Sequence, residues 1–180
     1  VLYICQMARK QGIKVLLSGV GGDDLFTGYR RHRAVQVDRY WRWLPYRVRS
    51  GLAQMTSGLD QQRMLNRRIA KVFSGADLEG DERLVHYFRW SGEEEILSLY
   101  TPETRLALGA QLAAKPMLDF LQKLPEGIAP LDRTLALEQR FFLADHNLTY
   151  TDKMSMAVGV EVRVPFLDLD LVDFATSIPL

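Results

Sequence analysis

The sequence predicts a mainly α-helical segment, on three observations. Of its 180 residues, 47% are hydrophobic and 25% are charged, which supplies enough apolar material for a folded core. Apolar residues recur at helical spacing in five or more stretches. Only two short runs, over residues 13–17 and 160–164, have the β-branched character of strands. Because so few strands cannot make a full sheet, either the chain is nearly all α or its sheet lies in sequence outside it.

The N-terminal part predicts a helix, a strand and a loop in that order. Leu2, Cys5, Ala8 and Arg9 follow one another at helical spacing, and Gly12 is a suitable C-cap. The run IKVLL over residues 13–17 is typical of a buried strand. The loop SGVGGDD over residues 18–24 then ends in two carboxylates. Both ends of the chain look cut from a longer protein.

The middle of the chain predicts short helices between polar connections. Residues 30–49 hold seven arginines mixed with aromatic residues, and Pro45 interrupts them. A basic helix is expected around residues 61–73. A capping box at Ser91 to Glu94 starts a helix that runs through Tyr100. Thr101 and Pro102 start another, because proline is well tolerated in the first turn of a helix.

The C-terminal part predicts two more helices and an extended segment. A helical turn or two is expected over residues 116–124, and residues 131–144 have the apolar spacing of a core-facing helix. Over residues 160–164, Glu161 and Arg163 alternate with valines, which predicts a strand with both charged residues on one face. A buried or half-buried Glu–Arg pair is the simplest explanation of that alternation.

Composition excludes several classes of protein. The 23 basic and 22 acidic side chains nearly cancel, which argues against binding nucleic acid through bulk positive charge. The single cysteine, Cys5, excludes an internal disulfide framework and a zinc site of the CxxC type. No apolar run approaches the roughly 20 residues needed to cross a bilayer, and the first residues lack the order of a secretory signal. We therefore expect a soluble, cytoplasmic protein with no membrane or nucleic-acid partner.

The loop over residues 18–24 carries the strongest chemical signal. A strand that feeds a glycine-rich loop exposes backbone N–H groups, which can hold phosphate or adenosine oxygens. The loop matches neither a Walker A loop nor a dinucleotide fingerprint, whose third glycine is replaced by Asp24. Carboxylates beside phosphates require a cation between them, and Mg²⁺ is the natural one. The alternative is a structural turn in which Asp23 or Asp24 caps a helix beginning near Leu25; both interpretations stay open.

The remaining signals favour structural roles. Arginines and aromatic rings over residues 30–49 are the ingredients of a nucleic-acid surface. Because Asp38 interrupts them and the chain is nearly neutral, a solvated amphipathic helix or a partner-facing surface is favoured. His32, His86 and His146 are scattered without the spacing of metal ligands, so we interpret them as ordinary residues.

Two longer motifs add a family resemblance. Residues 15–34, VLLSGVGGDDLFTGYRRHRA, resemble the SGxGGDELFxGYxRY-like signature of the asparagine synthase family. Residues 152–175, DKMSMAVGVEVRVPFLDLDLVDFA, resemble its DRxSMAxxxEVRVPFLD signature. The motifs occur in the family's order and together cover about a quarter of the chain. Two long motifs in the right order are a specific signal.

The resemblance implies that residues 1–180 are an excised part of the synthetase domain of a glutamine-dependent amidotransferase. Such domains have an α/β fold of the ATP-pyrophosphatase (adenine nucleotide α-hydrolase-like) type. They use ATP and Mg²⁺ to adenylate a carboxylate, and ammonia then displaces AMP to form an amide. The ammonia comes from glutamine, which a separate N-terminal glutaminase domain hydrolyses. By this resemblance the nucleotide contacts are Ser18, Gly19, Gly21 and Gly22, and the Mg²⁺ ligands are Asp23 and Asp24.

Four departures from the family pattern qualify this expectation. The SGGxDS pyrophosphate loop and the family's late lysine-bearing segment do not occur in these 180 residues. Val20 stands where characterised asparagine synthetases carry an acidic residue implicated in ammonia handling, and Asp24 stands where the family usually has glutamate. Valine can neither accept a proton from ammonium nor hold it by charge. A relative that amidates another carboxylate, such as a sugar carboxylate, fits this departure.

Two functions from different classes follow. The leading one is a piece of an ATP-dependent amidotransferase that holds part of the nucleotide and metal site and is inactive alone. The alternative is a non-catalytic helical interaction module that keeps the family motifs as scaffold. An isolated strand presents unpaired amides and carbonyls, so association with a second chain, as in a homodimer, is a further expectation.

Overall fold

The computed structural model describes residues 1–57, 63, 65–66, 70, 73–109 and 113–178. They fall into two compact units, residues 1–32 with 131–180 and residues 33–130. Helices dominate, as the sequence predicts, and the first unit also holds a small parallel sheet. The basic helix expected around residues 61–73 lies largely outside the described residues.

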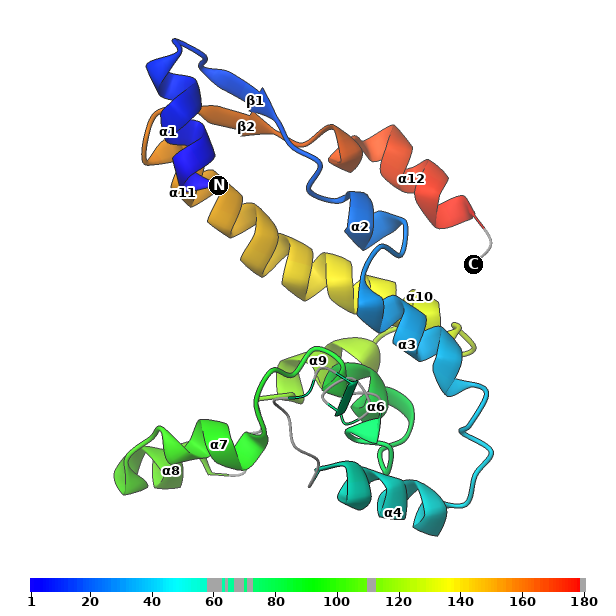
Figure 1. Cartoon of the computed structure of the whole chain (residues 1–180). Coiled ribbons are helices and arrows are strands. Elements are labelled where there is room, and N and C mark those ends of the chain that lie inside the picture. The colour runs from blue at the N-terminus through cyan, green and yellow to red at the C-terminus, as the bar shows by residue number, and fades with distance from the viewer. Residues whose placement is uncertain (58–62, 64, 67–69, 71–72, 110–112, 179–180) are drawn as a thin grey trace. The chain divides into compact units, whose positions relative to one another are not determined.

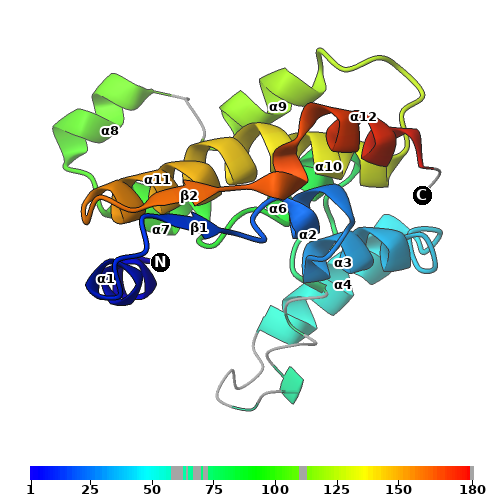
Figure 2. The same cartoon turned by 90° about the horizontal axis from the view of Figure 1, so that it is seen from above.

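The sheet of the first unit has two strands among the described residues. Strand β1 (Val15–Leu17) follows helix α1 (Leu2–Lys10) and pairs in parallel with β2 (Glu161–Arg163); the strands lie side by side in both views (Figure 1, Figure 2). Both predicted strands are therefore present. The prediction that the first is buried is wrong, since Val15 and Leu17 are 41% and 74% exposed. The reason is that the described part of the chain leaves one face of the sheet uncovered.

One long helical rod supports this unit. It comprises α10 (Pro130–Leu137), the π-helix η1 (Glu138–Leu148) and α11 (Thr149–Met156), which follow one another without a break (Figure 1). The helix predicted over residues 131–144 is confirmed, with Leu131 and Leu135 buried. It continues to Met156 because no helix-breaking residue occurs before Gly159, which has a positive φ. The apolar spacing did not predict the π-helical turns.

Short helices connect the sheet to the rod. Helix α2 (Gly22–Leu25) packs against η1, and α3 (Arg30–Asp38) begins just after it. After β2 come the 3₁₀ helix η2 (Pro165–Leu167) and helix α12 (Leu169–Ser177). Helix α12 packs against both η2 and α2. Asp168 caps α12, because its Oδ1 accepts hydrogen bonds from the two amides that follow.

The second unit is built from five further helices among its described residues. They are α4 (Tyr46–Ser57), α6 (Gly80–His86), α7 (Glu93–Ser98), α8 (Pro102–Leu108) and α9 (Lys115–Leu121). The predicted start of α8 is confirmed, since Thr101 caps it and Pro102 opens it. The predicted capping box of α7 is wrong: Gly92 is its N-cap, and no side chain caps it. The carboxylate of Glu93 instead pairs with Arg89 and the Ala113 amide.

A buried ion pair lies within the second unit. Arg83 donates to both carboxylate oxygens of Asp38, from Nε at 3.0 Å and Nη2 at 3.2 Å, and both side chains are almost fully buried. The guanidinium also lies over the rings of Trp41 and Tyr87. Asp38 and Trp41 of the arginine-rich segment are thus structural, while Trp43 of the same segment is 76% exposed.

Candidate functional site

The loop over residues 18–24 leaves the sheet at the carboxyl end of both strands. The Ser18 amide donates to the Arg163 carbonyl at 2.8 Å, which extends the parallel ladder by one bond. The Ser18 hydroxyl then accepts from the Val20 amide at 3.3 Å, and the Gly22 amide donates to the Gly19 carbonyl at 3.2 Å. These bonds turn the chain tightly into α2. The carboxyl edge of parallel strands is where α/β proteins usually place ligands.

The two sequence motifs meet at this loop. Gly21 has a φ of +96°, which strains any other residue, and a Cβ at this position would lie 2.5 Å from the Leu167 side chain, which would then have to shift. Gly22 lies next to Phe166, whose ring also meets that of Phe26 edge to face at 6.5 Å. Leu167 and Phe166 belong to the PFLD part of the second motif. The structure thus places the predicted glycines directly against that motif.

The two predicted metal ligands have different surroundings. Asp23 is exposed, whereas Asp24 is buried with 1% exposure. Asp24 Oδ2 accepts from the Tyr29 hydroxyl at 3.3 Å, and its Oδ1 has no hydrogen-bond partner in the described part of the chain. Burial raises the pKa of Asp24, and the nearby charge of Glu138 raises it further. The capping alternative is wrong, because α2 begins at Gly22 and neither aspartate caps it.

Tyr29 connects Asp24 to the long rod. Its hydroxyl donates to Asp24 and accepts from Asn147 Nδ2, each at 3.3 Å. Burial, followed by the Asp24 charge, raises the pKa of Tyr29 to about 12, so the phenol keeps its proton at neutral pH. The ring meets Phe142 edge to face at 5.7 Å.

A fully buried glutamate lies at the centre of the same cluster. Glu138 accepts two hydrogen bonds from Arg31, one of them from Nε at 2.6 Å, and a third from His32 Nε2 at 3.2 Å. Burial raises the pKa of Glu138, but the bonds from Arg31 and His32 outweigh it, and the pKa lies below its ordinary value. The Arg31 guanidinium lies over both the Tyr29 ring and the Phe142 ring, at 4.5 and 4.3 Å from their centroids.

Sequence reasoning missed this cluster. His32 was expected to be an ordinary residue, and neither Glu138 nor Arg31 was singled out. One signal was present: Glu138 is a charged residue on the apolar stripe that also contains Leu131, Leu135 and Phe142. A charged residue on a core-facing stripe predicts a buried partner of opposite charge. The sequence pattern does not identify that partner, because Arg31 lies more than a hundred residues away along the chain.

The donor set fits a magnesium ion through Asp23. Among the described residues, no group of three or more His, Cys, Asp or Glu side chains could hold a metal. Mg²⁺ usually takes only one or two carboxylates, together with waters and substrate phosphates. The exposed Asp23 carboxylate meets that description. Asp24 offers a free Oδ1 but lies buried against Tyr29, so it fits less well as a direct ligand.

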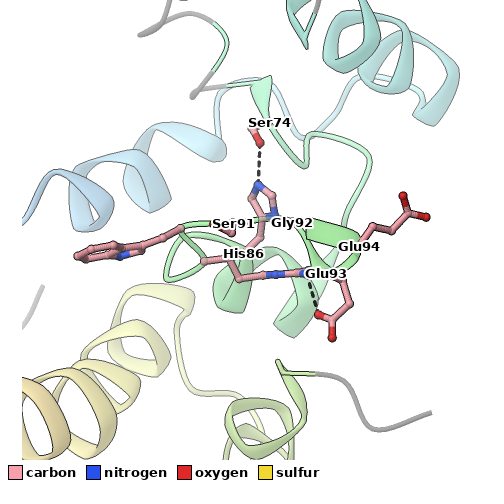
Figure 3. Close-up of a pocket in the computed structure, with 8 residues that line it drawn as sticks. Ser74, His86, Ser91, Gly92, Glu93 and Glu94 are labelled. Atoms are coloured by element: carbon pink, nitrogen blue, oxygen red, sulfur yellow. Dashed lines mark hydrogen bonds and ion pairs between the residues drawn. The ribbon is translucent and has the colours of Figure 1, made fainter. Parts of the chain in front are cut away.

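A separate polar pocket lies in the second unit, and it contains none of the predicted site residues. It encloses about 500 Å³ and is lined by Ser74, His86, Arg89, Trp90, Ser91, Gly92, Glu93 and Glu94 (Figure 3). The Ser74 hydroxyl and His86 Nε2 are 2.9 Å apart. Burial lowers the pKa of His86, and the charges of Arg83 and Arg89 lower it further. Gly75 is required here, because a Cβ would lie 2.7 Å from the His86 ring.

Two further expectations can be compared with the structure. Glu161 and Arg163 form an ion pair at 2.9 Å, but both side chains are more than half exposed, so the predicted burial of this pair is wrong. They lie on the uncovered face of the sheet. Within the described ranges, none of the helices has the length and apolarity to cross a membrane.

Comparisons with known proteins agree with the two motifs. A family model described as asparagine synthase matches residues 1–180. Putative asparagine synthetases (glutamine-hydrolyzing) of Mycobacterium bovis and Mycobacterium tuberculosis are each 28% identical over 99% of this chain and 26% of their own length. Asparagine synthetase (glutamine-hydrolyzing) 1 of Bacillus subtilis is 25% identical over 99% of this chain and 27% of its own length.

The chain thus spans about a quarter of the length of these curated relatives. No solved structure matches it significantly, so the ATP-pyrophosphatase type of fold stays a prediction. The family match covers every residue, including the loop and the PFLD segment that meet in the structure. The chain belongs to the asparagine synthase family.

Proposed function

We propose that this chain is the part of an ATP-dependent amidotransferase that holds the nucleotide and its magnesium ion. The whole enzyme would adenylate a carboxylate and form an amide with ammonia released from glutamine. One observation carries the proposal. The glycine-rich loop at the end of β1 packs against the second family motif, because Gly21, with its positive φ, lies directly against the Leu167 side chain. A loop kept in this form for packing alone would not need the exposed carboxylate of Asp23 at its end.

The predicted nucleotide contacts differ in what they can do. Gly19 is exposed, and its amide donates no hydrogen bond within the described ranges, so it can donate to a phosphate or adenosine oxygen. The Ser18 and Gly22 amides already donate to backbone carbonyls. We therefore assign Gly19 to direct contact, and Ser18, Gly21 and Gly22 to shaping the loop.

Asp23 is the residue that we assign to magnesium. When bound, Mg²⁺ supplies positive charge that offsets the negative charge developing on the leaving pyrophosphate. Asp23 would hold the ion at the exposed end of the loop, while Asp24 stays packed against Tyr29. The two adjacent carboxylates thus have different tasks, contact with the ion and anchoring of the loop.

The identity of the acceptor carboxylate is a separate proposal. Val20 is half-buried in the loop and offers no charge to ammonium. We propose that the acceptor is a carboxylate other than free aspartate, for example a sugar carboxylate. Aspartate belongs in the same assay as the comparison substrate.

The test uses the longest natural polypeptide that contains this chain. It is given ATP, Mg²⁺, glutamine and a panel of carboxylates, and pyrophosphate release and amide formation are measured together. We expect both products with at least one carboxylate. We also expect Asp23→Ala to lower the rate at least tenfold, and the exposed Asp173→Ala on α12 to leave it unchanged. Full activity in folded Asp23→Ala would contradict the metal assignment. Failure of the parent protein to bind ATP with Mg²⁺ would favour the non-catalytic interaction module.

A further inference from the structure

Three residues of the π-helical segment η1 contact residues 29–32, which follow the glycine-rich loop and α2. Glu138 holds Arg31 and His32, Phe142 stacks on the Arg31 guanidinium, and Asn147 donates to the Tyr29 hydroxyl. These three residues therefore lie on one face of the rod. We propose that η1 is a positioning element, which holds Tyr29 and Asp24 and thereby orients Asp23 toward the metal. This inference rests on the proposed function.

The π-helical turn explains why the three residues share a face. Glu138 and Asn147 are nine residues apart. In an α-helix, with 3.6 residues per turn, nine residues advance by two and a half turns, which places the two side chains on opposite faces. A π-helical turn takes about 4.4 residues, so the same nine residues advance by about two whole turns. Only the wider turn brings Asn147 beneath Tyr29 while Glu138 holds Arg31.

The stability of the chain gives no reason for this arrangement. A buried ion pair contributes little compared with apolar side chains of similar size. Glu138 lies on a stripe where leucine occupies Leu131 and Leu135, and a third leucine would extend the apolar core. π-Helical turns are rare and frequently occur at functional sites. The charged residue and the unusual turn occur together at the place where the rod meets the loop.

The path from η1 to the metal ligand is short. Tyr29 receives the Asn147 amide and donates to Asp24, and Asp24 lies next to Asp23. Helix α2, which carries both aspartates, also packs against η1. Loss of the contacts that hold Tyr29 should therefore displace the Asp23 carboxylate without unfolding the first unit.

The experiment compares three variants of the longest natural polypeptide. Asn147→Ala removes the hydrogen bond to Tyr29 together with a bond to the exposed His146 ring. Glu138→Gln removes the buried charge, and Arg140→Gln is the control on the exposed side of η1. Two quantities are measured: amide hydrogen exchange in peptides over residues 18–29, and the ratio of ATP affinities with and without Mg²⁺. A purely structural role would lower the unfolding temperature without changing that ratio.

We expect exchange over residues 18–29 to accelerate in Asn147→Ala and Glu138→Gln but not in Arg140→Gln. We also expect the enhancement of ATP affinity by Mg²⁺ to fall several-fold in Asn147→Ala and roughly tenfold in Glu138→Gln. If Glu138→Gln does not fold, Asn147→Ala decides alone. Wild-type exchange and a wild-type affinity ratio in folded Asn147→Ala would overturn the inference. If the parent protein binds no ATP, the proposed function fails, and hydrogen exchange still decides whether η1 holds the loop.

Discussion

The two neighbouring aspartates show how burial divides the work of similar side chains. Asp23 is exposed and keeps its carboxylate available to solvent, whereas Asp24 is buried against Tyr29 near a second carboxylate, Glu138. Ionisation of Asp24 in the folded state therefore lowers the free energy of unfolding. Such strain is common where a loop is arranged for binding rather than for folding.

The first prediction concerns the charge of Asp24. Its pKa in the folded state is raised, so between the ordinary value of 3.8 and the folded value the native state binds more protons than the unfolded one. The free energy of unfolding therefore falls as pH rises through that window, and the loss persists at neutral pH. Asp24→Asn keeps an acceptor for Tyr29 without the charge. We expect urea unfolding to show a gain in stability at neutral pH that shrinks in acid. An equal effect at both pH values would contradict this account.

The second prediction concerns His86, whose pKa is lowered mainly by burial. Between the folded value and the ordinary 6.5, the unfolded state binds more protons, so the free energy of unfolding falls as pH drops below about 6.5. His86→Gln can keep a bond to Ser74 and should flatten this part of the pH profile. The same change at exposed His146 serves as the comparison. A profile for His86→Gln that matches the wild type would show that the decline has another source.

At the scale of elements, the turns depend on backbone conformations that only some residues adopt. Gly21 combines a φ of +96° with close contact to Leu167, and Gly12 has a φ of +78° with open space around it. Gly92 has neither constraint, with a φ of −67° and no neighbour within reach of a Cβ. The three glycines therefore separate backbone strain from steric overlap.

The third prediction uses this series of glycines. Gly12→Ala should lower the free energy of unfolding by about 1 kcal/mol, from backbone strain alone. Gly21→Ala should lower it by about 2–4 kcal/mol, because overpacking adds to strain. Gly92→Ala should change it little. Chemical denaturation measures all three, and Leu167→Ala added to Gly21→Ala should restore part of the loss. Equal values for Gly12→Ala and Gly21→Ala would show that Leu167 moves aside freely.

Local sequence patterns predicted those elements whose structure depends mainly on neighbouring residues. Apolar spacing was sufficient for α1 and for the rod, and Thr101 with Pro102 was sufficient for the start of α8. The π-helical turns could not be read, because they depend on contacts of η1 with Tyr29 and Arg31 far away in sequence. At the site, the motifs identified the loop and its glycines. The burial of Asp24 depends on Tyr29 and Glu138 and not on the residue type, so no pattern separated it from Asp23.

At the scale of the whole molecule, the first unit exposes much apolar surface. Tyr3 and Met7 of α1 are 80% and 69% exposed, Leu17 of β1 is 74% exposed, and Phe174 of α12 is 61% exposed. Each strand of the sheet also has one edge unpaired among the described residues. Large exposed apolar patches and free strand edges are characteristic of surfaces that other protein segments cover.

The last prediction follows from this surface and from the charge of the chain. A formal net charge of +1 gives little repulsion between copies, so the isolated 180-residue chain should associate as its concentration rises. Met7→Lys with Leu17→Lys should reduce that association, because two charges then interrupt the exposed apolar surface of α1 and β1. Leu106→Lys, at a position 85% exposed in α8 of the second unit, is the matched control and should associate like the wild type. Sedimentation velocity across a range of concentrations distinguishes these cases. A wild-type chain that stays monomeric throughout would show that the exposed residues of α1 and β1 do not drive contact between copies.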